Sequence, residues 1–154
     1  MKQIKFPKNR YALVDDRDYL KILKYKWHID GRGYVMRNRL TKDDGSPIQL
    51  HRLILNPSQD KQVDHINGDR LDNRRDNLRV CSKSQNMCNR GPQKNNTSGF
   101  KGIYYDKFAE KWRAKANFNG KVYSIARSKS KDKVIRAYNR LISKIQGEFA
   151  KLIS

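Results

Sequence analysis

Cysteine is scarce in this chain of 154 residues, and the two cysteines present, Cys81 and Cys88, have six residues between them. This spacing matches neither a zinc knuckle nor a disulfide framework. We also expect no four-ligand zinc site, because there is no second cysteine pair to complete it. We therefore expect two free thiols in a reducing cytoplasm, with Cys81 half-buried.

Long apolar runs are missing too. No stretch is long enough to span a membrane, and no secretory signal peptide is recognisable, so we expect no membrane partner. Acidic residues are few, with 15 Asp and Glu against 35 Lys and Arg. Glu is the rarer acid, since it occurs only at Glu110 and Glu148. Asp suits turns, helix caps and metal sites better than helix surfaces.

The resulting net charge of +20 is high for a chain of this length. Such a chain repels itself unless it lies beside a polyanion, and nucleic acid is the commonest one. Residues 1–90 hold 20 basic and 11 acidic side chains, and residues 91–154 hold 15 and 4. Both halves are therefore expected to contact the same polyanion. On charge alone, a basic ribosomal or packaging protein fits as well as an enzyme acting on nucleic acid.

The N-terminal third predicts short elements. Residues 11–14 favour a strand, and Asp15 with Asp18 predicts the start of a helix that runs through Leu23. Further strands are expected at 27–29, 34–37 and 48–50, with turns at Gly31, Gly33 and residues 43–47. Residues 91–99 are polar, with Gly and Pro, and indicate a linker and a domain boundary.

The C-terminal third predicts a sheet with one helix. Residues 111–118 alternate between an apolar face and a face bearing Arg113, Lys115 and Asn117. Asn119-Gly120 is a strong hairpin signal, and residues 121–127 return as the partner strand. A two-residue turn would place Ala116 opposite Tyr123 and Ala114 opposite Ile125. Residues 102–105 are expected to form a third strand.

A helix is then predicted from the Ser130 cap to Gly147, with an apolar stripe that covers the apolar face of the sheet. The other face stays open and basic, which suits a surface that enters a DNA groove. A merely solvated face is the alternative. We favour binding, because neighbouring like charges repel unless something neutralises them.

The densest chemistry lies in residues 63–86. It consists of three pieces: Asp64-His65-Ile66-Asn67-Gly68-Asp69, then Asp72-Asn73-Arg74-Arg75-Asp76-Asn77-Leu78-Arg79, then Ser84-Gln85-Asn86. Val63 and residues 78–80 predict two strands, and Ser82 with Gln85 forms a capping box for a helix that carries Asn86. The predicted order is strand, loop, strand, helix, which brings the end of the first strand beside the start of the helix.

This order suggests a metal-assisted hydrolytic site. Asp64 and Asn86 offer oxygen ligands, which suit a hard divalent ion such as Mg²⁺ or Mn²⁺. An unperturbed imidazole titrates near neutrality, as a general base should, so His65 is the expected base, and Asn77 is expected to orient the imidazole. Singly, each piece is usually ordinary surface sequence, but their conjunction in a strongly basic chain favours catalysis.

The three pieces together resemble the HNH endonucleases, in particular the phage and intron-encoded homing branch. The resemblance covers about residues 48–90. It implies a ββα-metal site with Asp64 and Asn86 as metal ligands, His65 as general base and Asn77 as its orienting residue. It also implies cleavage that leaves 3′-hydroxyl and 5′-phosphate ends. Asn86 stands where many of these enzymes have His, which leaves the preferred metal open.

Two histidines outside the motif also need interpretation. Similar His-Arg-Leu pieces precede the catalytic motif in the homing branch, so His51 and Arg52 are second-tier candidates for phosphate contact or structural support. His28 is expected to be structural.

The C-terminal part resembles the AP-two/ethylene-response-factor DNA-binding domain over about residues 97–153. The resemblance rests on Phe100 to Tyr105, Lys111 to Ala114, Ala137 to Asn139 and Gly147 to Ala150. It implies that the sheet enters the major groove, with Lys101, Tyr104, Lys115 and Asn117 at groove-facing places and Arg113 on the same side. Fewer arginines lie on the strands than in plant members. Gly102-Ile103-Tyr104 also invites a GIY-YIG reading, which is rejected because the rest of that series does not follow.

The expected protein is thus an α+β, metal-dependent DNA endonuclease with three parts: a nuclease domain with a strand-rich extension at 1–91, a linker at 92–99 and a DNA-binding domain at 100–154. Its partner is double-stranded DNA, without a small-molecule cofactor, in a bacterial or phage-infected host cell. It acts as a monomer that nicks or a homodimer that cuts both strands. The alternative is a DNA-binding regulator with a degenerate, inactive nuclease site.

Overall fold

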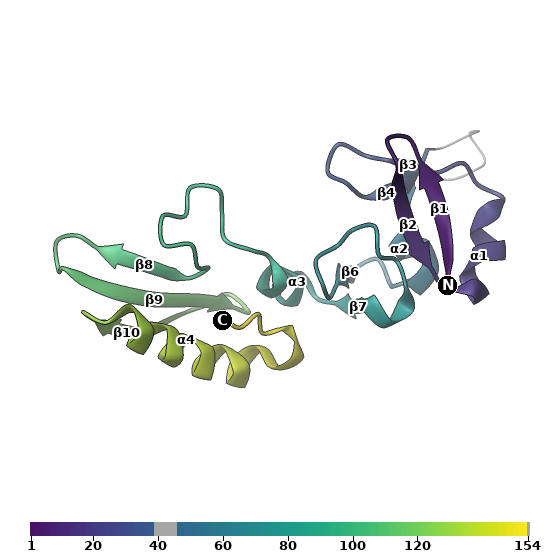
Figure 1. Cartoon of the computed structure of the whole chain (residues 1–154). Helices are drawn as coiled ribbons and strands as arrows, with labels where there is room; N and C mark the ends of the chain where they lie inside the picture. The colour runs from purple at the N-terminus through teal and green to yellow at the C-terminus, as the bar shows by residue number, and fades with distance from the viewer. Residues whose placement is uncertain (39–45, 154) are drawn as a thin grey trace. The chain divides into compact units, whose positions relative to one another are not determined.

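The computed structural model describes residues 1–38 and 46–153. They fold into two compact units, Met1–Ser82 and Lys83–Ser154 (Figure 1). The units contain helices and several antiparallel sheets, as the expected α+β class requires. None of the helices in these described ranges is both long and apolar enough to cross a membrane.

The first unit opens with a hairpin of β1 (Lys2–Phe6) and β2 (Arg10–Val14), followed by α1 (Asp16–Leu23). Strand β2 and helix α1 match the predicted elements. Strand β1 was not predicted, because only two of its five residues are apolar and it ends at a turn with positive φ at Lys8 and Asn9. Phe6, Ala12 and Val14 point into the core.

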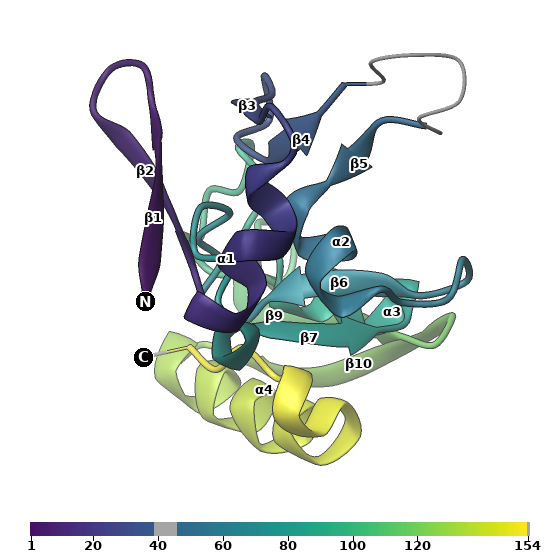
Figure 2. The same cartoon turned by 90° about the vertical axis from the view of Figure 1, so that its right-hand side faces the viewer.

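A small sheet of β3 (His28–Ile29), β4 (Val35–Arg37) and β5 (Ile48–Gln49) follows. These strands confirm the three predicted ones, with small differences in length. Asp43, Asp44 and Gly45 of the predicted turn lie outside the described residues. Helix α2 (Leu50–Leu55) was not predicted. It lies against the next two strands (Figure 2) and buries Leu50 and Ile54 in the core.

The strand, loop, strand and helix order predicted for residues 63–86 is confirmed. Strands β6 (Gln62–His65) and β7 (Leu78–Cys81) pair antiparallel, joined by a loop that ends in the 3₁₀ turn η2 (Arg75–Asn77). Helix α3 (Lys83–Asn89) comes next and falls within the second unit.

The loop between β6 and β7 is tied to the N-terminal hairpin by backbone hydrogen bonds. The Leu13 amide donates to the Leu71 carbonyl at 2.8 Å, and the Asn73 amide donates to the Leu13 carbonyl at 2.8 Å. The loop therefore continues the hydrogen bonding of β2, and the N-terminal extension is part of the scaffold of the site.

The second unit contains the three-stranded sheet β10-β9-β8, formed by β8 (Ile103–Asp106), β9 (Lys111–Phe118) and β10 (Lys121–Ser128). Helix α4 (Lys131–Gln146) covers one face of it (Figure 1), and η3 (Gly147–Phe149) follows. The Ser130 hydroxyl caps the helix by accepting from the Lys133 amide, as predicted. The three-stranded sheet with one helix is confirmed.

One predicted register is wrong. Ala116 lies opposite Tyr123 as expected, but Ala114 lies opposite Ala126 instead of Ile125. A bulge between Ser124 and Ala126 inserts one residue into β10. As a result both Ile125 and Ala126 pack against the core beneath α4, which strict alternation does not allow.

Candidate catalytic site and basic sheet face

Asp64 is buried in the middle of the β6–β7 ladder, opposite Arg79. The Arg79 guanidinium donates to Asp64 Oδ2 from Nε at 2.9 Å and from Nη2 at 2.8 Å. Arg79 thereby gives this carboxylate, which is only 6% exposed, the charged partner that a buried charge needs. The arginine also fixes the direction in which the carboxylate points.

His65 ends β6 and is also buried. Its Nε2 lies 3.4 Å from Asn73 Oδ1. The Asn73 amide nitrogen donates to the carbonyls of Arg70 and Leu71, at 3.2 and 3.1 Å. These two bonds orient the Asn73 side chain, so its oxygen faces the imidazole and accepts. In the neutral ring the proton is therefore on Nε2 and the lone pair is on Nδ1.

Packing fixes the position of the imidazole further. The His51 ring lies edge-on to it with centroids 4.9 Å apart, and the Tyr34 ring lies 6.1 Å from His65 and 5.4 Å from His51. Burial lowers the pKa of His65, against the raising effect of the Asn73 contact and of nearby carboxylates. Burial, followed by the charges of His65 and Arg52, lowers the pKa of His51 to about 3. Both rings are thus held in the neutral form.

His51 and Arg52, the second-tier candidates, have different surroundings. His51 is 3% exposed, and its Nδ1 has no hydrogen-bond partner among the residues that the structure describes. The Arg52 guanidinium donates to the Lys61 carbonyl at 2.9 Å. His28 is exposed on β3.

Asn77 lies in the same loop but bonds the backbone. Its Oδ1 accepts from the Asn67 amide at 3.0 Å, and its Nδ2 donates to the Asp72 carbonyl at 2.8 Å. Both polar atoms of the side chain therefore close the loop, and the imidazole contact that was predicted for Asn77 belongs to Asn73. Sequence reasoning missed Asn73 because two asparagines four residues apart in a loop give no sign of which one faces inward.

Further side chains stiffen the loop. Arg74 donates to both oxygens of Asp72, at 2.7 and 2.6 Å, and Asn67 donates to Asp72 at 3.1 Å. The Arg74 hydrogen bonds lower the pKa of the buried Asp72 carboxyl, which outweighs the raising effect of burial. Charge-assisted hydrogen bonds thus help to hold the loop in shape, together with the packing of Leu71 against the core.

Arg75 connects the loop to helix α1. Its guanidinium donates to both oxygens of Asp18, each at 2.7 Å, and its amide donates to Asp15 Oδ2 at 2.8 Å. Asp15 stands at the N-cap of α1 as predicted, but its carboxylate serves Arg75 and makes no cap bond. These contacts, 57 and 60 residues apart in sequence, could not be read from the local pattern.

The donor atoms at Asp64 suit a hard divalent ion, because a buried carboxylate stands beside an imidazole that is held neutral. In the described ranges, no group of three His, Cys, Asp or Glu side chains is gathered closely enough to bind a metal. Amide, phosphate and water oxygens are further ligands that suit a hard ion beside a carboxylate. The other predicted ligand, Asn86, lies on α3 in the second unit.

In the second unit, the sheet face away from α4 carries a basic row, which we call the open face. Cross-strand pairing places Tyr104, Arg113 and Arg127 side by side on β8, β9 and β10. Lys115 and Asn117 follow along β9, and the Lys115 ammonium lies 5.8 Å from the Tyr104 ring centre. Asp106 pairs with Arg113 at 2.6 Å. Arg127 belongs to this face and was missed, because the bulge in β10 hides the alternation.

Lys101 has a different role from the predicted DNA contact. Its ammonium donates to the carbonyls of Met87 and Cys88 at the end of α3. Burial lowers the pKa of this ammonium. Lys101 thus satisfies carbonyls that a helix end leaves without partners.

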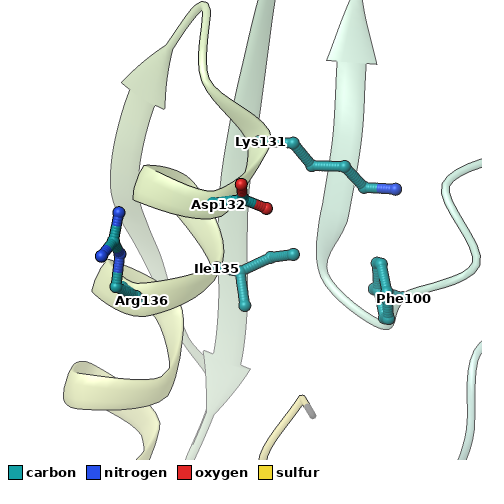
Figure 3. Close-up of a pocket in the computed structure, with 5 residues that line it drawn as sticks. All are labelled: Phe100, Lys131, Asp132, Ile135 and Arg136. Atoms are coloured by element: carbon teal, nitrogen blue, oxygen red, sulfur yellow. The ribbon is translucent and has the colours of Figure 1, made fainter.

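The first turns of α4 border a shallow pocket with Phe100, shown in Figure 3. Lys131 reaches toward Phe100, with its ammonium 4.6 Å from that ring and 4.7 Å from the Trp112 ring, and it donates to the Ser98 carbonyl at 3.0 Å. These contacts hold the segment before β8 against α4.

The free thiols of Cys81 and Cys88 are buried, and burial raises the pKa of Cys81 to about 11.

Comparison with known proteins agrees with this geometry. The family model described as HNH endonuclease matches residues 56–88, which hold β6, the loop, β7 and most of α3. An uncharacterized HNH endonuclease of Acanthamoeba polyphaga mimivirus is 31% identical over 151 residues, which is 93% of this chain and 74% of the relative. Protein 3.8 of Escherichia phage T7 is 35% identical over 89 residues, which is 58% of this chain and 73% of the relative. No solved structure matches.

The fold and the loop chemistry thus define a nuclease-type site on a β-hairpin scaffold. The chain belongs to the HNH endonuclease family. Enzymes of this family generally depend on a divalent metal and act on DNA.

Proposed function

We propose that this protein is a metal-dependent DNA endonuclease of the homing type, which hydrolyses phosphodiester bonds. The observation that carries the proposal is the buried Asp64–His65 pair at the end of β6, with the carboxylate aimed by Arg79 and the imidazole held by Asn73. The rigid charge-bonded loop around the pair supplies the preorganisation that catalysis needs.

The proposed general base is His65 through Nδ1. Asn73 holds the proton on Nε2, so the lone pair on Nδ1 accepts the proton of the attacking water. The edge-on contact with His51 keeps the ring from rotating. Asn77 acts at a distance, because it shapes the loop and does not touch the imidazole.

Asp64 is the proposed metal ligand in this unit, and Asn86 is the second one on the strength of the sequence motif. A bound Mg²⁺ or Mn²⁺ would stabilise negative charge on the phosphate and on the leaving oxygen. Arg79 pairs with this carboxylate at 2.8 Å and holds it in place.

The open face of the second unit is the proposed DNA-binding surface, and its AP-two resemblance stays part of the proposal. Arg113, Lys115 and Arg127 carry positive charge, and Asn117 is able to read an adenine edge. Tyr104 packs beneath the Lys115 ammonium. The protein would work in the cytoplasm of a bacterial or phage-infected cell, as a nicking monomer or as a homodimer.

Nicking of supercoiled plasmid, with and without EDTA, tests the proposal. We expect the wild type to convert plasmid to open circles in Mg²⁺ or Mn²⁺ and EDTA to abolish the reaction. Asp64→Ala should stop cleavage while DNA binding remains. His65→Ala should slow the chemical step by roughly 10²–10⁴-fold, which is the usual contribution of a general base.

The same assay separates the alternative of a DNA-binding regulator with an inactive site. A wild type that shifts DNA in a gel but leaves plasmid intact in every divalent metal would establish that alternative and reject the nuclease.

A further inference from the structure

The four arginines of the loop and β7 differ in their partners. Three are paired with carboxylates: Arg74 with Asp72, Arg75 with Asp18 and Arg79 with Asp64. Arg70 is exposed and has no carboxylate partner among residues 1–38 and 46–153. The loop that follows the proposed general base therefore displays one guanidinium whose charge is not neutralised by a carboxylate of the described residues.

The Arg70 guanidinium is nevertheless held in place. It stacks on the Tyr34 ring, with 4.6 Å from Cζ to the ring centre, and its Nη1 donates to the Arg32 carbonyl. The charge of the neighbouring Arg32 is neutralised by Asp30, because Arg32 donates to Asp30 Oδ2 from both Nε and Nη2. Within residues 1–38 and 46–153 the bond to the Arg32 carbonyl is the one side-chain hydrogen bond of the exposed Arg70, so its other N–H groups are available to a ligand.

The position of this guanidinium is close to the reacting groups. The Tyr34 ring contacts the Arg70 guanidinium and also the imidazoles of His51 and His65. One aromatic ring thus separates the exposed cation from the proposed general base. Stacking and the carbonyl bond remove most of the rotamer freedom that an exposed arginine loses on binding.

We propose that Arg70 is a phosphate-binding residue. It binds a backbone phosphodiester of the DNA strand next to the bond that is cut, and Tyr34 is its positioning residue. The inference rests on the proposed function and extends it to a named substrate contact. A planar guanidinium binds phosphate oxygens in a two-pronged manner that a lysine cannot copy. This contact fixes the strand relative to His65, so it serves the chemical step as well as binding.

The competing explanation is structural, since Arg70 also ties the loop to the turn between β3 and β4. Arg17 provides a matched control. It is exposed on α1 and has no carboxylate partner in the described part of the chain, but it touches neither Tyr34 nor the imidazoles. Arg17→Ala removes one positive charge, as Arg70→Ala does, but it removes no proposed phosphate contact.

The first measurement is the affinity for a 30-base-pair duplex of mixed sequence, in EDTA, at several salt concentrations. We expect Arg70→Ala to reduce the slope of log K against log salt by about one, because one phosphate contact is lost. Arg70→Lys should keep the slope. An unchanged slope for Arg70→Ala, or an equal reduction in Arg17→Ala, overturns the proposal.

The second measurement is plasmid nicking at saturating enzyme. We expect Arg70→Ala and Arg70→Lys to lower the single-turnover rate by 10-fold or more, Tyr34→Leu to lower it less, and Arg17→Ala to leave it unchanged. A drop in melting temperature with an unchanged salt slope would assign Arg70 a structural role only. If the wild type binds DNA but does not nick it, the proposed function fails, whereas the salt slope still decides whether Arg70 holds a phosphate.

Discussion

The asparagines and aspartates of the catalytic loop each perform a separate task. Asn73 faces the imidazole, Asn77 closes the loop and Asp72 neutralises Arg74. All three side chains are buried, although their polarity suggests solvent exposure. They tolerate burial because each is hydrogen-bonded, which is the condition that a low-dielectric interior sets. A polar loop sequence thus encodes a packed polar core.

Asp72 makes this polar core sensitive to acid. Its pKa in the folded protein lies below the unfolded value, so its stabilising effect is complete above about pH 4 and is lost as the pH falls through the folded pKa. We expect Asp72→Asn to lower the free energy of unfolding by about 1–2 kcal/mol at pH 5–7, since Arg74 remains partly in solvent. Urea unfolding as a function of pH measures it.

The test is how the difference in free energy of unfolding between wild type and Asp72→Asn depends on pH. The difference should be constant from pH 7 to pH 5 and should shrink below pH 4. Asp60→Asn is the control, because that carboxylate is exposed and bonds only within its own turn. A difference that grows as the pH falls would contradict the role given to Asp72.

The sequence predicts some side chains of the site well and others poorly. Asp64 and His65 were singled out by the strand, loop, strand and helix pattern, and the structure places both within β6, buried and hydrogen-bonded. The orienting role of Asn77 was transferred from the motif, whereas the contact is made by Asn73. Tyr34 and Asp18 gave no sign of a role at the site, because they reach it from other parts of the chain. Local patterns carry spacing within an element but not contacts between distant ones.

At the level of elements, alternation and turn signals perform well where strands are regular. Strand β9 was predicted to the residue, and β10 to within one. Two features escaped. Helix α2 has six residues, which is too short for a helical period to show. The bulge in β10 leaves no sequence mark, because Ser124, Ile125 and Ala126 all suit a strand.

Gly102, the residue before β8, packs tightly against β9 and α4. Its φ is +76°, and a Cβ there would lie 2.5 Å from the Lys115 carbonyl oxygen and 2.7 Å from Tyr138 Cε2. We expect Gly102→Ala to destabilise the second unit by about 2–4 kcal/mol, through overpacking and backbone strain together. Thermal unfolding monitored by calorimetry measures this loss of stability.

Gly120 provides the matched control, since its φ is also +76° but nothing lies within 4 Å of an added Cβ. Gly120→Ala should cost only the backbone strain, about 1–2 kcal/mol. Equal losses in the two variants would show that the close approach at Gly102 contributes nothing.

At the scale of the whole molecule, the division into Met1–Ser82 and Lys83–Ser154 differs from the predicted boundary in the 92–99 linker. The polar composition of residues 91–99 suggested a break there. The helix α3 before it instead groups with the second unit, in which Lys101 donates to the carbonyls at its end and Ser84 accepts from the Asn119 amide. Composition locates loops, whereas domain membership depends on contacts.

Each unit has its own apolar core, so we predict that they respond separately to mutation. Asp18→Ala leaves Arg75 without its partner and should lower the stability of the first unit by about 2–3 kcal/mol, since Arg75 is one-third exposed. Calorimetry should show a lowered transition for this unit and an unchanged one for the other.

The control is Asp16→Ala on the same helix, because Asp16 is exposed and pairs only with the N-terminal amine. It should leave both transitions nearly unchanged. A shift of both transitions in Asp18→Ala would mean that the two units unfold together.

The backbone hydrogen bonds from Leu13 to Leu71 and Asn73 have a consequence for inheritance. The family motif covers only residues 56–88, but its loop is completed by a strand encoded more than forty codons upstream. Recombination that transferred the motif alone would deliver a loop with two unpaired backbone groups and an uncompensated Arg75. We therefore expect functional exchange between genomes to move the N-terminal hairpin, helix α1 and the motif as one block.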